Sequence, residues 1–171
     1  MQQHRAGDTL KINVCVKKRP IFQQELEKGE IDVVSCSNPK IICHEAKYKV
    51  DGITKYIDNQ SFEFDNTFSH DESNEELYHY SLEPILDLVF NTGTITIFAY
   101  GQTGSGKTFT MQGLQNLAVQ DLFERGIDYW QNDQRNFAVT VSMYEIYGGK
   151  LYDLLNNHEQ LKLMEDKNQK I

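Results

Sequence analysis

The residues with the clearest chemistry form the run GQTGSGKT at positions 101–108. Their spacing fits GxxxxGK[ST], a pattern typical of loops that bind phosphate. The glycines at 101, 104 and 106 allow backbone angles that turn successive N–H groups toward an anion. A helix that begins at Lys107 would add the positive end of its dipole. We therefore predict that this loop binds the phosphates of a nucleoside triphosphate.

Two side chains of the loop have distinct expected roles. Lys107 is expected to reach the β- and γ-phosphates, and the Thr108 hydroxyl is expected to bind the Mg²⁺ that bridges them. A glycine-rich turn without a ligand is the alternative, but an apparent strand before the loop and a helix after it favour nucleotide binding. The candidate nucleotide ligands are Gly101, Gln102, Thr103, Gly104, Ser105, Gly106, Lys107 and Thr108.

Hydrolysis of a triphosphate needs groups beyond this loop. An acidic residue after an apolar strand must help to hold Mg²⁺, and another group must orient the attacking water. No Asp or Glu after Thr108 is identified at this position, since Asp121, Asp128 and Asp153 lie in helical or loop patterns. No catalytic residue is therefore assigned in this chain.

The segments around the loop must position it. Residues 94–100 are almost wholly apolar or β-branched, which predicts a strand buried on both faces of a parallel sheet. Residues 107–111 begin a helix, and residues 117–125 continue a helical pattern. The alternation of strands and helices along the chain indicates the α/β fold class.

A second helix is predicted over residues 73–91. Ser73 and Glu76 form a capping box, Pro84 predicts a kink, and Gly93 ends the pattern. Period-two alternation or short β-like runs predict further strands at residues 10–17, 31–35, 40–44, 60–64, 137–143 and 161–164, with a tight loop at 49–52 and a helix at 151–156.

Composition and charge narrow the class of protein. The 171 residues suggest one domain, and 39% hydrophobic and 25% charged residues are typical of a soluble globular protein. A net charge of −8 argues against nucleic-acid binding. No apolar run is long enough to cross a membrane, and the polar start MQQHRAGDTL lacks a signal core. Three cysteines fit no zinc spacing and indicate reduced thiols in a cytosolic protein.

Three blocks of sequence resemble the kinesin motor family. FAYGQTGSGKTFTM at 98–111 resembles its phosphate loop, KINVCVKKRP at 11–20 resembles its first strand, and YEIYGGKLYDLL at 144–155 resembles a later strand with the segment that follows. The blocks follow the family's order and cover most of the chain. The resemblance implies a P-loop NTPase fold with a central β-sheet flanked by helices, over residues 10–171 after an N-terminal extension at 1–9.

The family also implies ligands and partners. By this resemblance Lys17, Arg19 and Pro20 line the adenine side of ATP, whereas by their residue types alone they are a strand-ending turn with solvated charges. The cofactors are ATP and Mg²⁺, the partners are tubulin and microtubules, and neither nucleic acid nor a membrane is expected. The expected location is the microtubule cytoskeleton of the cytoplasm.

Within the family, the chain is most similar to the internal motors that depolymerise microtubules. CVKKRP at 15–20, Pro84, and Gly93 in place of a base-stacking Tyr resemble that class. Lys49, Val50 and Asp51 match its Lys-Val-Asp finger, which projects toward tubulin. A solvated loop is the alternative for these three residues.

The chain departs from the family in two ways. Residues 112–118 are much shorter than the family's loop insertion, and the switch motifs Asn-x-x-Ser-Ser-Arg-Ser-His and Asp-Leu-Ala-Gly do not occur. We expect the N-terminal half of a motor domain, truncated before the switch regions and inactive alone. A non-catalytic nucleotide- or tubulin-binding module is the alternative. An unrelated P-loop kinase or GTPase would need a base-specificity motif or a lid, and neither occurs. No coiled-coil heptads reveal an oligomeric state.

Overall fold

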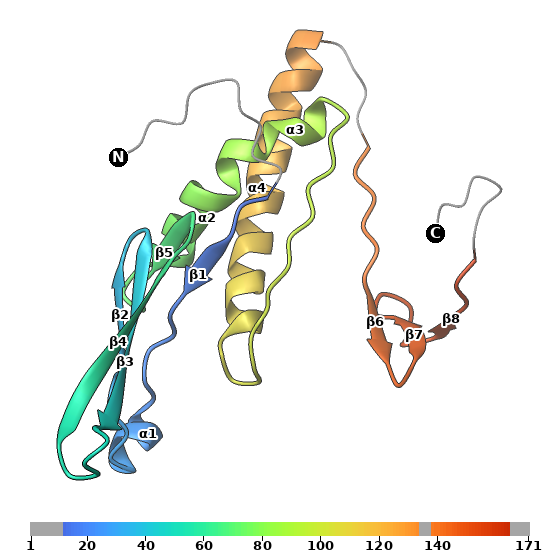
Figure 1. Ribbon diagram of the computed structural model, residues 1–171. Helices are drawn as coiled ribbons and strands as arrows, with labels where there is room; N and C mark the ends of the chain where they lie inside the picture. Colours follow the sequence, from blue (N-terminus) through green and yellow to red (C-terminus); the bar gives the residue numbers. More distant parts are fainter. Residues whose placement is uncertain (1–11, 134–137, 165–171) are drawn as a thin grey trace. The chain divides into compact units, whose positions relative to one another are not determined.

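The computed structural model describes residues 12–133 and 138–164. The chain divides into two compact units, Met1–Asp128 and Tyr129–Ile171, each described by itself (Figure 1). All of the predicted phosphate and adenine contacts lie in the first unit.

Two small sheets belong to the first unit (Figure 1). Strands β2 (Val34–Ser37), β3 (Lys40–Tyr48) and β4 (Lys55–Glu63) form an antiparallel sheet in the order β2-β3-β4. Strands β1 (Cys15–Lys17) and β5 (Asn66–Phe68) pair in parallel. The predicted strands at 40–44 and 60–64 are confirmed within β3 and β4, apart from residue 64, and both strands extend further than predicted. The loop at 49–52 is confirmed as part of the turn between them.

Helix α2 (Asn74–Ser81) begins where the sequence predicts it. The Ser73 side chain accepts a hydrogen bond from the Glu76 N–H, and the Glu76 carboxylate accepts one from the Ser73 N–H. Two N–H groups that lack partners inside the helix are satisfied in this way. The predicted capping box is therefore confirmed.

The predicted single helix over 73–91 is wrong in its continuity. A 3-10 turn, η1 (Glu83–Ile85), follows α2, and a short helix, α3 (Asp87–Phe90), follows the turn. Pro84 lies in η1 and has no N–H to continue an α-helical ladder. The proline thus causes a break into three segments rather than a kink.

Helix α4 (Lys107–Asp133) is 27 residues long. The helical predictions at 107–111 and 117–125 are both confirmed, but they belong to one helix. Residues 112–118, where the family resemblance suggests a shortened loop, are helical throughout. Deleting a loop insertion between two helical segments in phase allows one continuous hydrogen-bond ladder. A further helix, α1 (Gln23–Glu27), follows β1.

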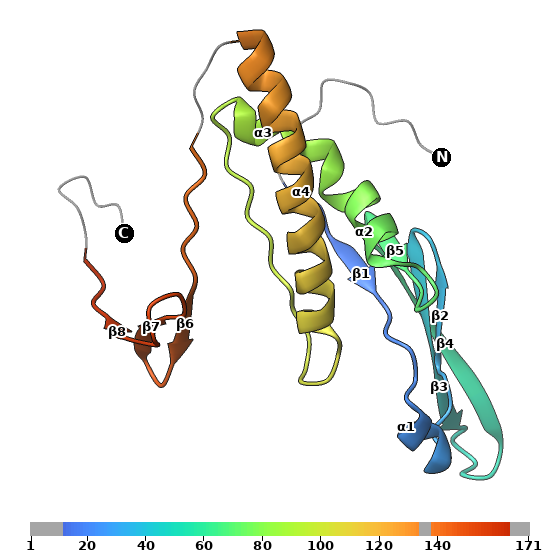
Figure 2. The same cartoon turned by 180° about the vertical axis from the view of Figure 1, so that it is seen from behind.

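The core of the first unit lies where α2 and α4 meet β5. A cluster of buried side chains comes from these three elements and from Leu82, the residue that follows α2: Phe68, Leu77, Tyr78, Leu82 and Leu114. Both ribbon views show α2 and α4 side by side (Figure 2). This packing holds the start of α4 against α2 and β5, and with it the end of the phosphate loop.

The second unit contains a three-stranded antiparallel sheet of β6 (Tyr144–Tyr147), β7 (Lys150–Asp153) and β8 (Gln160–Leu161). Gly148 and Gly149, with φ of 58° and 73°, connect β6 to β7. Two positive φ angles are what a two-residue hairpin turn requires. The predicted helix at 151–156 is therefore wrong, and the predicted strand at 161–164 is confirmed only at its first residue.

Two predicted strands are absent from the described residues. Residues 94–100 pair with no described strand, and the Phe98 and Tyr100 side chains are 88% and 102% exposed. Residues 138–143 are likewise unpaired, and Phe137 lies outside the described residues. A strand exists only when a neighbouring strand supplies hydrogen bonds, which a local pattern cannot guarantee. Of the strand predicted at 10–17, residues 10 and 11 lie outside the described residues, and β1 covers only 15–17 of the rest. Strand β2 begins three residues after the predicted start at 31.

None of the helices in the described ranges combines the length and the apolar character needed to cross a bilayer.

Candidate phosphate-binding site

The phosphate loop depends on three glycines with unusual backbone angles. Gly101, Gly104 and Gly106 have φ of 154°, 81° and 93°. Side chains rarely adopt these angles, so glycine is required for this path. A Cβ on Gly101 would also lie 2.5 Å from Oγ of Ser105. The loop therefore combines a left-handed backbone with a close approach of Gly101 to Ser105.

Lys107 holds the loop together. Its Nζ donates hydrogen bonds to the carbonyl oxygens of Gly101, at 2.7 Å, and of Gln102, at 2.9 Å. The Ser105 N–H donates to the same Gln102 oxygen at 3.2 Å. The ammonium group thus lies over the first residues of the loop, where an anion that approached the loop would meet a positive charge.

Helix α4 directs its N-terminus at the same loop. Its first turn carries no acidic residue, so no carboxylate cancels the positive end of the helix dipole. Thr108 is exposed in this first turn, with Thr103 and Gly104 exposed in the preceding turn. The structure therefore brings together the glycine-rich backbone, the lysine and the hydroxyl of the motif at the N-terminus of α4.

The predicted adenine-side residues are arranged differently. Arg19 forms an ion pair with Glu25, with Nη1 2.7 Å from Oε2, and lies 4.5 Å from the centroid of the Phe22 ring. The hydrogen bond from Arg19 lowers the pKa of Glu25 to about 2. Pro20 is exposed. Within the described part of the chain, the Arg19 guanidinium donates to the Pro20 carbonyl and to Glu25, not to the phosphate loop.

Lys17 connects to α4 through a residue that the sequence reading missed. Its Nζ donates to Oδ1 of Asn74 at 2.9 Å, and Nδ2 of Asn74 donates to the carbonyl oxygen of Phe109 at 3.4 Å. Burial lowers the pKa of Lys17, and the carboxylates of Glu72, Glu75 and Glu76 act in the opposite direction. Asn74 therefore links β1, α2 and the first turn of α4. The local pattern gave no signal for this role.

The candidate tubulin finger lies at the tip of the β3–β4 hairpin. The Asp51 carboxylate accepts hydrogen bonds from the N–H of Ile53 at 2.9 Å, and from the N–H and hydroxyl of Thr54. The Thr54 hydroxyl is the main cause of a lowered pKa at Asp51. The turn is thus held by Asp51, while the Val50 side chain is fully exposed at 108%.

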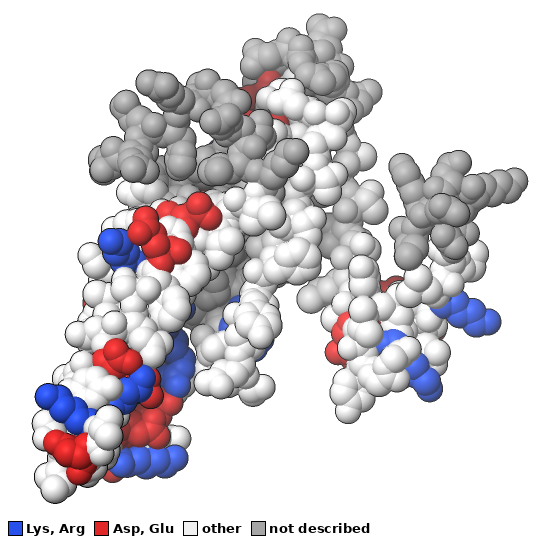
Figure 3. All heavy atoms as spheres, viewed as in Figure 1, with Lys and Arg blue, Asp and Glu red and all other residues white. Residues whose placement is uncertain are grey.

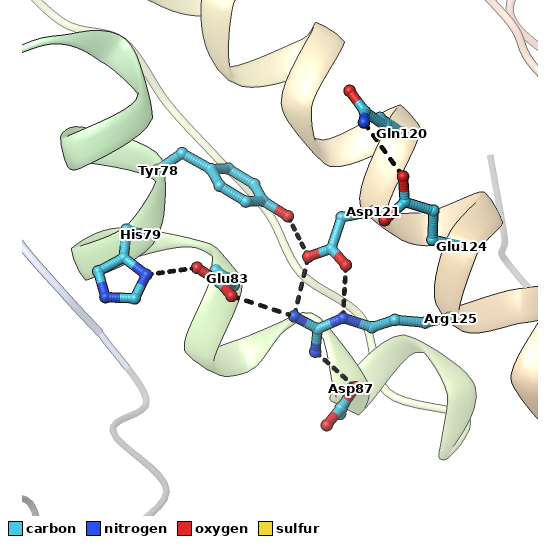
Figure 4. A network of polar contacts seen from close by, with 8 residues as sticks. All are labelled: Tyr78, His79, Glu83, Asp87, Gln120, Asp121, Glu124 and Arg125. Atoms are coloured by element: carbon cyan, nitrogen blue, oxygen red, sulfur yellow. Dashed lines mark hydrogen bonds and ion pairs between the residues drawn. The ribbon is translucent and has the colours of Figure 1, made fainter.

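Asp121, one of the acidic residues after the loop, takes part in a polar network between α2 and α4 (Figure 4). Its carboxylate accepts hydrogen bonds from Nε and Nη2 of Arg125, at 2.7 and 2.8 Å, and from the Tyr78 hydroxyl at 2.6 Å. Nη1 of Arg125 also donates to Asp87 at 2.7 Å. This arrangement joins two helices and explains why Asp121 does not serve the phosphate loop. The described residues also contain no cluster of three or more potential metal-binding side chains.

Comparison with known proteins agrees with the geometry of the loop. The family described as "Kinesin motor domain" matches residues 17–171. The protein named "Diatom spindle kinesin-1", from Cylindrotheca fusiformis, is 43% identical over 159 residues, which cover 91% of this chain and 25% of that relative. The chain thus spans about a quarter of the relative's length. The mixed α/β content and the P-loop fold agree with the prediction. The chain belongs to the kinesin motor domain family.

Proposed function

We propose that this chain is the ATP-binding part of a kinesin motor that couples ATP hydrolysis to work on microtubules. The observation that carries the proposal is the position of Lys107, whose ammonium group contacts the loop carbonyls at the N-terminus of α4. Residues 101–108 would hold the phosphates, and Thr108 would bind Mg²⁺. Family membership supports this assignment because kinesin motor domains bind nucleotide, generally with Mg²⁺.

Binding of a fluorescent ATP analogue tests the site. Lys107→Ala should weaken binding at least about ten-fold, since it removes the charged hydrogen bonds to phosphate. Thr108→Val should remove the dependence of affinity on Mg²⁺ while leaving the fold intact. Lys28→Ala, an exposed lysine at the end of α1, is the control and should bind as the unmodified chain does. Equal affinities of the Lys107→Ala and Lys28→Ala variants would contradict the proposal.

We further propose that Lys17, Arg19 and Pro20 contact the adenine side of ATP. For Arg19 this requires exchange of the Glu25 ion pair for the nucleotide. Glu25→Gln would free Arg19, so it should strengthen ATP binding if Arg19 contacts the ligand. Unchanged or weaker binding by this variant would argue that the Arg19–Glu25 pair is only a structural contact.

The depolymerising subfamily remains a proposal that rests on residues 15–20, 49–51 and 84 of this chain. The exposed Val50 at the tip of a hairpin of two nine-residue strands supports a contact with tubulin, because the tip projects beyond its own sheet. The name of the diatom relative refers to the spindle, a microtubule structure. Microtubule pelleting with Lys49→Ala and Val50→Ala should show weaker binding than with Lys28→Ala.

A non-catalytic module is the second candidate function. Neither switch motif occurs in these 171 residues, so none of their groups is assigned to sense the γ-phosphate. We expect the 171 residues to bind nucleotide without microtubule-stimulated turnover. Phosphate release well above the basal rate on addition of microtubules would overturn this expectation and would favour a complete ATPase.

A further inference from the structure

Strand β4 is an edge strand whose outer side has no partner among the described strands. The order β2-β3-β4 places it at the end of its sheet (Figure 1). Its nine residues pair with β3 without a bulge, from Tyr48↔Lys55 to Lys40↔Glu63. Long regular edges of this kind are ready to pair with another strand.

The hydrogen-bond pattern identifies which residues face outward. Lys49 donates from its N–H to the Thr54 carbonyl, and Phe64 donates to the Pro39 carbonyl, so residues 54 and 64 face β3. Hydrogen-bonding groups alternate along a strand, and the register is regular between these positions. The N–H and C=O groups of Lys55, Ile57, Asn59, Ser61 and Glu63 therefore point away from β3 and lack a strand partner within the described sheet.

The sequence of β4 is complementary to itself. If two copies pair in antiparallel fashion about Asn59, Lys55 of each copy lies opposite Glu63 of the other. Tyr56 then lies opposite Phe62, and the two Asn59 residues face each other. Opposite charges and aromatic pairs directly across strands are the favourable combinations. One register thus matches the charges at both ends and the aromatic residues between them.

Exposure and charge support the same pairing. The Ile57, Tyr56 and Phe62 side chains are 64%, 42% and 48% exposed, so a second strand could bury apolar surface there. Residues 40–63 contain four lysines and four carboxylates, although the whole chain carries a charge of −8. Blue and red side chains are interspersed over this sheet in Figure 3. Two copies of the sheet therefore meet without the repulsion that the net charge would otherwise cause.

We propose that two copies of this chain associate through their β4 edges, forming a continuous six-stranded antiparallel sheet about a two-fold axis at Asn59. The contact is isologous, because each copy uses the same residues. It does not involve the phosphate loop, so it is independent of the nucleotide proposal. A small polar interface of this type corresponds to weak, reversible association.

Charge reversal tests the register by sedimentation velocity on the full 171-residue chain. Lys55→Glu and Glu63→Lys should each weaken self-association about ten-fold or more, because each places like charges opposite one another at both ends. An equimolar mixture of the two variants should regain the association of the unmodified chain, since every cross-strand charge pair is then opposite again. Lys49→Glu, which makes the same charge change at the hairpin tip, is the control and should associate normally.

Two further results decide the proposal. Ser61→Pro removes an outward N–H and leaves the backbone hydrogen bonds with β3, so it should weaken association while circular dichroism stays unchanged. If the unmodified chain remains monomeric up to about 1 mM, the proposal is wrong. It is equally wrong if the mixed variants associate no better than either variant alone, which would show that the charges at Lys55 and Glu63 do not meet.

Discussion

At the residue scale, a comparison of Gly104 with Gly149 distinguishes an effect on ATP binding from the cost of a left-handed backbone. Their φ angles are 81° and 73°, and a Cβ on either would have no atom within 4 Å. Replacement by alanine should therefore cost about 1 kcal/mol at each position, through the left-handed backbone alone. Only Gly104→Ala should also weaken ATP binding, several-fold, because only Gly104 lies in the loop. Equal ATP affinity of the two variants would argue against a role for the loop angles.

Asp121 gives a pH-dependent prediction. The hydrogen bond from Arg125 is the main cause of its lowered pKa, with a further contribution from Tyr78. A folded-state pKa below the unfolded value adds stability above the unfolded pKa, and this stability is lost as the pH falls through the folded value. Asp121→Asn should therefore lower the free energy of unfolding at pH 7 and flatten its fall below about pH 4. Urea unfolding across this range measures the effect.

The control for this variant is Glu124→Gln on the same helix, whose carboxylate contacts Gln120 rather than a cation. If the free energy of unfolding of Asp121→Asn fell as steeply with decreasing pH as that of the unmodified chain, Asp121 would not be the source of this pH dependence. The difference between variants is decisive here because other carboxylates titrate in the same range.

These residues also show the limits of sequence reading. The eight loop positions could be predicted because their chemistry lies in local spacing, and the structure brings them together at the N-terminus of α4. Whether they bind ATP remains a prediction. Asn74, Tyr78 and Arg125 could not be assigned a role, since their partners lie 35 to 57 residues away in sequence. Only the packing of α2 against α4 brings these partners together.

At the element scale, Gly113 marks a close approach of α4 to Asn74 of α2. A Cβ there would lie 2.7 Å from Cγ of Asn74 and would push this side chain away from Lys17 and Phe109. Gly→Ala within a helix normally stabilises by about 1 kcal/mol. Gly113→Ala should instead lower the melting temperature. In an Asn74→Ala background the cost should shrink, because most of the crowded side chain is gone; additive effects of the two changes would contradict this account.

Elements were predicted well where the signal is local. The capping box at Ser73 and Glu76 and the helical start at Lys107 are both present. The Gly148-Gly149 pair was a hairpin signal that the sequence reading passed over, and the helix predicted at 151–156 was wrong for that reason. The sequence correctly predicted that Pro84 interrupts the helix. Whether the interruption is a kink or a break depends on the packing of the segments on either side.

At the scale of the whole molecule, residues 94–100 show why strands resist prediction from sequence. Their apolar pattern is typical of a strand inside a sheet, yet no described strand supplies the hydrogen bonds. Pairing depends on distant segments, and exposed apolar residues such as Phe98 are an aggregation hazard when those segments do not pair.

Hydrogen exchange should therefore divide the chain sharply. Amides of α4 and of the β3–β4 ladder should exchange slowly, because their hydrogen bonds are closed within regular elements. Amides of residues 94–100 and 138–143 should exchange close to the rate of an unstructured peptide. Addition of ATP with Mg²⁺ should slow exchange at 101–108 and leave 94–100 fast, because the ligand supplies partners to the loop but not to a strand. Protection of 94–100 that persists on dilution would contradict this, since it would require a strand partner within the same chain.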